Sequence, residues 1–165
     1  MATVSVTTTN FGTIDIADEQ VLHLPRGLIG IPDTRWVLLT REPDSPFLWF
    51  QSIDDPDLAL PVTRPEIFYP DYELTVPEEV LAGVGLQAGH EVEVLCVVRA
   101  SDKLEDFTVN LRGPVVFDAS TRTGAQMATL RDYPVAASLW EQKGINQIET
   151  GAPNLPVVVV PKEQV

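Results

Sequence analysis

Short apolar runs, each ending at turn-forming residues, recur along this chain and leave it few folds to adopt. In residues 4–6 and 12–16 every second side chain is apolar, and Asn10 separates the two runs. A period of two turns one face inward and one outward, which is typical of β-strands. We expect further strands at 21–24, 35–40, 47–53, 58–63, 91–99, 107–112, 115–117 and 126–130.

Two tight turns are predicted between these runs. Residues 54–57 read Asp-Asp-Pro-Asp, in which Asp side chains accept backbone N–H groups and the proline fixes its own φ. This turn predicts a hairpin of 47–53 with 58–63. Residues 121–124 predict a second turn, directly before the strand expected at 126–130.

A single short helix interrupts the strand pattern. Thr75 and Glu78 have the spacing of a capping box, and Pro77 suits the first helical turn, so we expect a helix to Ala82 that stops at Gly83. About ten strands and one helix predict an all-β protein, a small antiparallel β-barrel-like domain, because closure removes exposed strand edges. The 14 prolines also favour the all-β class, because proline ends helices.

The 165 residues fit one domain, which we place at residues 1–140. Residues 141–165 differ in composition from the rest of the chain, because a polar stretch is followed by Gly151, Pro153 and Pro156. We interpret them as a C-terminal tail. Its valine run at 157–160 has two interpretations, a strand added to a sheet edge of this chain or of a partner, or a disordered chain end.

The net charge of -13 is concentrated in residues 42–79, which hold ten of the 24 carboxylates and one cation, Arg64. Such acidity predicts no direct nucleic-acid binding, because phosphate contacts need Lys or Arg, and it favours basic protein partners or simply solubility. No segment has the ~20 apolar residues of a membrane span, so no membrane contact is expected. The polar N-terminus lacks a signal-peptide pattern and Cys96 is a lone cysteine, which together predict a cytoplasmic protein.

Few residues suggest catalysis. The two histidines and Cys96 lack metal-ligand spacing, and no nucleophile elbow or phosphate loop occurs, so we expect no enzyme, no cofactor and no metal. Cys96 lies among valines and is expected in the core. The loop at 54–57 has three interpretations: a calcium loop without its usual glycine and closing glutamate, a solvated turn, or a partner contact. Glu91 and Glu93 share a strand face, which fits an exposed surface or an acid–base pair.

The aromatic residues divide into two expected groups. Trp36 and Trp49 lie within apolar runs and are expected in the core. Tyr69 and Tyr72, on either side of Pro70 and Asp71, are candidates for a partner contact or for a packed turn.

Six segments, in this order and with these gaps, resemble the flagellar assembly factor FliW family over roughly residues 4–135. The segments are Phe11–Ile16, Pro25–Gly30, Phe47–Ser52, Asp55–Leu60, Phe68–Glu73 and Thr108–Val116. The chain departs from the family pattern at Ile29-Gly30-Ile31, at Phe50 and at Gly113-Pro114, and each change keeps the apolar character.

The resemblance implies a small β-barrel that acts as a regulator without catalysis. Such proteins bind flagellin in the cytoplasm and also bind CsrA, an RNA-binding translational repressor. When flagellin is secreted, the freed protein takes CsrA, and flagellin mRNA is released for translation. Two alternatives are a chaperone for flagellin alone, and a β-barrel carrier or enzyme that uses the acidic loop. The expected partner contacts are Asp55, Asp57, Tyr69, Asp71, Tyr72, Glu73 and Asn110.

Overall fold

The computed structural model describes residues 2–86, 89–139 and 153–161. Its strands are β1 Thr3–Thr8, β2 Gly12–Ala17, β3 Leu22–His23, β4 Arg35–Thr40, β5 Phe47–Ser52, β6 Ala59–Thr63, β7 Val92–Arg99, β8 Thr108–Val109, β9 Val115–Asp118, β10 Thr123–Gln126, β11 Ala137–Ser138 and β12 Val158–Val159. The helices are α1 Pro65–Phe68 and α2 Glu78–Gly83, with 3-10 turns η1 Asp18–Gln20 and η2 Leu104–Asp106. The predicted all-β class is confirmed.

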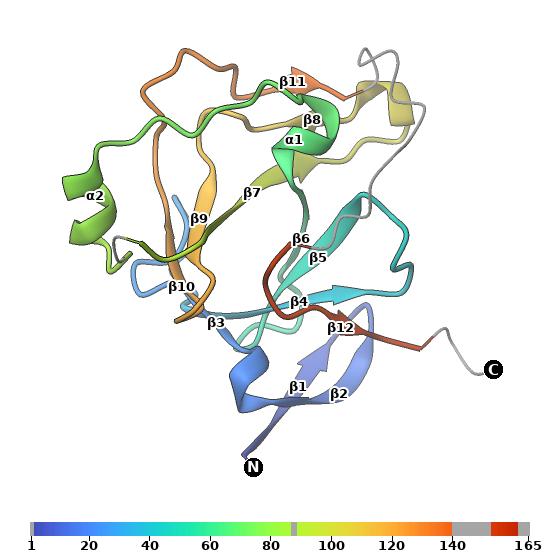
Figure 1. Cartoon of the computed structure of the whole chain (residues 1–165). Helices are drawn as coiled ribbons and strands as arrows, with labels where there is room; N and C mark the ends of the chain where they lie inside the picture. Colours follow the sequence, from blue (N-terminus) through green and yellow to red (C-terminus); the bar gives the residue numbers. More distant parts are fainter. Residues whose placement is uncertain (1, 87–88, 140–152, 162–165) are drawn as a thin grey trace.

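The main sheet bends round on itself, as Figure 1 shows. Its strand order is β11-β8-β7-β6-β5-β4-β3-β10-β9. Because β9 also pairs with β7, the strands from β7 to β9 form a ring. The link between β3 and β10 is one residue pair, Thr123 with His23, so the barrel is not strictly closed. The predicted hairpin is confirmed, because β5 and β6 pair antiparallel from Phe47–Thr63 to Gln51–Ala59.

Strand β4 is buried on both faces and divides two apolar cores. Trp36 and Leu38 face the barrel interior, where Trp36 stacks on Phe50 at 4.4 Å between ring centroids. Val37 and Leu39 face the other way, against the β1–β2 hairpin. This burial explains why 36–39 is an unbroken apolar run instead of a strictly alternating one.

The C-terminal segment packs against the same strand. β12 pairs in parallel with β4, Val158 opposite Leu39 and Val159 opposite Thr40. Leu155 belongs to the barrel core and Val160 to the core beneath the hairpin. Of the two interpretations of the valine run, the structure therefore shows strand addition, and the strand is added to this chain's own sheet.

Several local predictions were wrong. The described residues contain two short helices instead of one, and α2 begins after Pro77 with no side-chain capping bond, so the predicted capping box does not form there. The strand expected at 126–130 is β10 at Thr123–Gln126. The turn before it lies at residues 119–122, about two residues earlier than expected, with Arg122 at a positive φ of 62°. The strand expected at 107–112 is reduced to Thr108–Val109, because Asn110 begins a turn.

Candidate functional site

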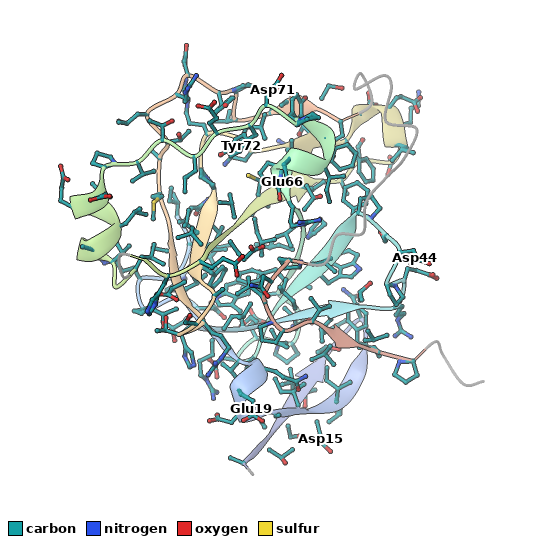
Figure 2. The ribbon with its side chains drawn as sticks, in the orientation of Figure 1. Asp15, Glu19, Asp44, Glu66, Asp71 and Tyr72 are labelled. Atoms are coloured by element: carbon teal, nitrogen blue, oxygen red, sulfur yellow. The ribbon has the colours of Figure 1, made fainter. Side chains whose placement is uncertain are left out.

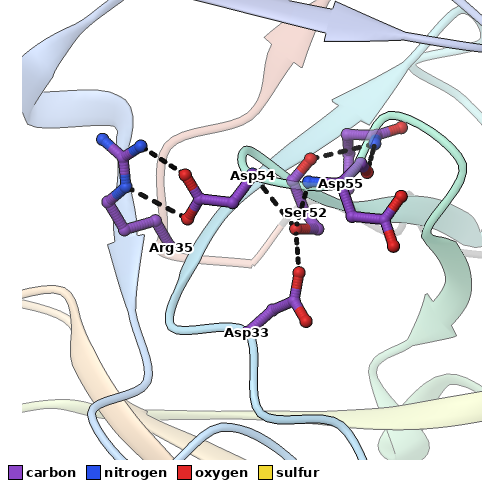
Figure 3. A network of polar contacts seen from close by, with 6 residues as sticks. Asp33, Arg35, Ser52, Asp54 and Asp55 are labelled. Carbon is purple, nitrogen blue, oxygen red and sulfur yellow. Dashed lines mark hydrogen bonds and ion pairs between the residues drawn. The ribbon is translucent and has the colours of Figure 1, made fainter.

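The acidic loop between β5 and β6 is held by a buried glutamine and a serine. The Nε2 of Gln51 lies 2.9 to 3.4 Å from the carbonyl oxygens of Ser52, Asp55, Pro56 and Leu58. The Oγ of Ser52 accepts the backbone N–H groups of Asp54 and Asp55 and donates to Asp33, 2.6 Å away (Figure 3). The loop is therefore fixed in shape, as its turn residues predicted.

Each carboxylate of this loop also has a partner within the chain. Asp54 forms a bidentate ion pair with Arg35, in which Oδ1 of Asp54 lies 2.5 Å from Nη2 of Arg35. Hydrogen bonding between the two side chains lowers the pKa of Asp54 and raises the pKa of Arg35. Asp55 accepts the N–H of Asp57 at 3.0 Å, and Asp57 accepts the hydroxyl of Thr9 from the hairpin. Each of these carboxylates therefore accepts at least one hydrogen bond from within the chain.

Residues 69–73 form a second surface, at the opposite end of the molecule from the β1–β2 hairpin (Figure 2). Tyr69 donates its hydroxyl to the carbonyl of Ser138, and Tyr72 donates to the carbonyl of Leu111 at 2.8 Å. Asp71 lies between them and is exposed. Two half-buried phenol anchors therefore hold an exposed carboxylate in a fixed place.

The neighbouring Glu73 belongs to the same surface. Its backbone N–H donates to the hydroxyl of Tyr133 at 3.0 Å, and its exposed carboxylate pairs with Arg131. Tyr133 in turn stacks on Tyr72, with ring centroids 4.7 Å apart. Burial is the main cause that raises the pKa of the Tyr72 phenol, so this ring stays neutral and acts as a hydrogen-bond donor.

Asn110 is a turn residue directly before Leu111, whose carbonyl accepts the Tyr72 hydroxyl. Its Oδ1 accepts the backbone N–H groups of Arg112 and Gly113 at 3.1 and 2.9 Å. Beside it is a hollow of about 330 Å³ whose lining includes the strongly exposed Ile29 and Val135.

The structure thus brings together four of the seven predicted contacts, Tyr69, Asp71, Tyr72 and Glu73. Asp55 and Asp57 lie on another part of the surface, beside the hairpin, because Thr9 bonds to both Pro56 and Asp57. Whether any of these residues touches a partner stays a prediction.

An aromatic groove was missed by sequence reasoning. We use this name for the hollow of about 600 Å³ lined by Asn10, Phe11, Thr40, Arg41, Glu42, Ser45, Phe47, Trp49, Pro61, Val98, Ala100 and Phe107. Trp36 is fully buried as expected, but Trp49 is 38% exposed, so its predicted place in the core was wrong. Trp49 points outward because Leu48 and Phe50, its neighbours on β5, point inward.

Across the described parts of the chain, no three His, Cys, Asp or Glu side chains are grouped to hold a metal ion. Within the same residues, every helix is too short or too polar to cross a bilayer.

Together these observations define an acidic, barrel-like all-β domain whose notable surfaces consist of carboxylates and aromatic rings. The sequence model of the FliW protein family matches residues 5–139. The chain belongs to this family, as the sequence resemblance predicted.

Named relatives and a solved structure agree. A flagellar assembly factor FliW of Geotalea uraniireducens (strain Rf4) is 35% identical over 150 residues, covering 87% of this chain and 92% of the relative. The flagellar assembly factor FliW of Caldanaerobacter subterraneus subsp. tengcongensis is 33% identical over 122 residues, which cover 73% of this chain and 81% of the relative. A crystal structure of the flagellar assembly factor FliW superposes with a TM-score of 0.75 and 25% identity, covering 84% of this chain and 99% of the other.

Proposed function

We propose that this protein is a flagellar assembly factor that works in the cytoplasm by binding two proteins in turn, flagellin and the translational repressor CsrA. It makes or breaks no covalent bond. Membership of the FliW family supports the flagellar role, because the relatives are named for flagellar assembly. The net charge of -13 supports a basic protein, such as an RNA-binding repressor, as one partner.

The observation that carries the proposal is the rigid acidic surface at residues 69–73. Tyr69 and Tyr72 are anchored by their hydroxyl groups, so Asp71 is presented without a large cost of ordering the loop on binding, whereas Glu73 beside it is already paired with Arg131. A protein that binds RNA must expose lysine and arginine, and the exposed carboxylate of Asp71 is suited to meet them.

Electrostatics then gives a mechanism for antagonism. An acidic domain docked beside an RNA-binding surface places negative potential where phosphates would lie. Each pair of like charges costs on the order of 1 kcal/mol near a surface, and several pairs add. RNA affinity would fall even if the RNA site itself stayed uncovered.

The alternative of a carrier or enzyme that uses the acidic loop gains no support from the geometry. Asp54 is paired with Arg35, Asp55 caps its own turn and Asp57 bonds to Thr9. These carboxylates serve the loop itself. A chaperone for flagellin alone differs from our proposal only in lacking CsrA, and the experiment below separates the two.

The test is calorimetric titration of the purified chain with flagellin and with CsrA, each alone and then in competition. We expect both to bind and flagellin to displace CsrA. CsrA binding should weaken steeply between low and high salt. Binding of flagellin but not of CsrA would support the alternative of a chaperone for flagellin alone. Binding of neither protein would overturn the proposal.

The contact surface is tested by Asp71→Lys, with Asp15→Lys as the matched control. Both side chains are exposed, and they lie at opposite ends of the molecule (Figure 2). We expect Asp71→Lys to weaken CsrA binding several-fold, on the order of 1 kcal/mol, and the control to change it little. Equal effects of the two variants would remove residues 69–73 from the contact.

A further inference from the structure

The aromatic groove has an apolar floor built from several elements. Phe47 and Trp49 project from the outer face of β5, and Pro61 lies opposite Trp49 on β6. Phe107 lies 6.3 Å from Phe47 between ring centroids, and Phe11 meets Trp49 edge to face at 6.4 Å. Among these rings Trp49 is exposed, Phe47 and Phe107 are half-buried and Phe11 is buried. An exposed tryptophan in an apolar hollow is the type of residue that anchors protein partners.

One wall of the groove is braced. The guanidinium of Arg41 lies 4.9 Å from the centre of the Phe11 ring and donates to the carbonyls of Asn10 and Pro161, at 3.1 and 3.2 Å. This side chain therefore ties the hairpin, β4 and the C-terminal segment together. These acceptors are uncharged, so Arg41 keeps its positive charge in the lining, and any attraction for a basic partner must come from acidic residues of the neighbouring loops.

Two loops that border the groove are acidic. The loop at 41–46 contributes Glu42 and Ser45 to the lining and also carries Asp44, which points outward at the side of the molecule (Figure 2). The loop at 100–107 contributes Ala100 and Phe107 to the lining and carries three exposed carboxylates and one lysine, at Asp102, Lys103, Glu105 and Asp106.

We propose that the aromatic groove is a docking site for a protein segment in which an apolar side chain is flanked by lysine or arginine. The apolar side chain would lie on Trp49 and Phe47, and its basic neighbours would meet the two acidic loops. The argument rests on charge complementarity around an apolar floor and does not depend on residues 69–73. A basic side chain could also lie over the exposed face of Trp49.

The test uses three short synthetic peptides and the full chain. In the first, a leucine pair is flanked by lysines; in the second, glutamine replaces the lysines; in the third, serine replaces the leucines. Binding is followed by the indole N–H signal of Trp49 in ¹H–¹⁵N NMR spectra, assigned with Trp49→Phe. We expect saturable movement of this signal with the first peptide, and much weaker responses with the other two.

Paired charge reversals locate the effect. Asp44→Lys with Asp106→Lys changes both bordering loops, whereas Asp15→Lys with Glu19→Lys makes the same charge change on and beside β2, away from the hairpin turn that lines the groove; Figure 2 shows Asp15 and Glu19 well apart from Asp44. All four side chains are exposed, so folding should survive, which the NMR spectrum itself reports. We expect about tenfold weaker binding for the first pair and less than about a twofold change for the second.

Each other result would overturn the inference in a defined way. Equal binding of the glutamine peptide would make the groove a general apolar surface, and equal binding of the serine peptide would reduce the effect to net charge. Equal losses in the two double variants would also show that only net charge matters. An unmoved Trp49 signal would place any binding elsewhere.

Discussion

Leu155→Ala tests whether the C-terminal segment is a working part of the fold. Leu155 lies beyond the residues matched by the family model, yet its side chain is 7% exposed and belongs to the barrel core with Trp36 and Phe50. Truncating a buried leucine costs about 2 to 5 kcal/mol, from lost transfer energy and the cavity left behind. Because the segment beside Leu155 is a short strand that can shift into the cavity, we expect about 3 kcal/mol.

Guanidinium unfolding followed by circular dichroism measures this loss. For a domain of this size it corresponds to a melting temperature lower by about 6 to 12 °C. Val159→Ala is the matched control, since Val159 lies on the same segment but is 55% exposed, and it should cost less than about 0.5 kcal/mol. If Leu155→Ala changed stability no more than this control, the segment would contribute nothing to the core and our reasoning would fail.

Three further predictions concern the backbone, the buried thiol and a phenol anchor. Gly27→Ala should destabilise by more than about 2 kcal/mol in thermal melts, because φ is 65° and a Cβ would lie 2.4 Å from a backbone oxygen, whereas Gly30→Ala, with open space, should cost about 1 kcal/mol. Burial raises the pKa of the Cys96 thiol from 9.0 to about 12, so the native protein should react with a thiol reagent only on unfolding. The same shift means that its stabilising contribution, complete below pH 9, declines as pH rises toward 12, which lowers urea midpoints. Tyr72→Phe leaves the carbonyl of Leu111 without its donor and should cost about 1 kcal/mol by urea titration, and no loss would contradict that hydrogen bond.

Strands with a local signal could be predicted well. The runs at 35–40 and 47–53 correspond to β4 and β5 almost to the residue, because the polarity of consecutive residues indicates which of their side chains are buried. The loop at 54–57 closes the β5–β6 hairpin for a local reason too, since its backbone groups bond to side chains only a few residues away, those of Gln51, Ser52 and Asp55.

Features that depend on distant partners could not be predicted. β11 is two residues long and exists only because it pairs with β8, so it leaves no periodic pattern. Trp49 was expected in the core because its neighbours are apolar, but the register of β5 turned it outward. The seven predicted contacts were chosen for residue type, and type alone does not say which loops meet in space.

The order of apolar, polar and turn-forming residues was enough to determine the all-β class, the position of most strands, the acidic character and the resemblance to the FliW family, since each is a property of neighbouring positions or of their sum. Tertiary structure alone decided that residues 69–73 lie far from the β1–β2 hairpin, that Leu155 completes the barrel core, and that Phe11, Trp49 and Phe107 line one groove. These arrangements arise from pairing between strands far apart along the chain, and long-range register is set by the packing of the whole molecule.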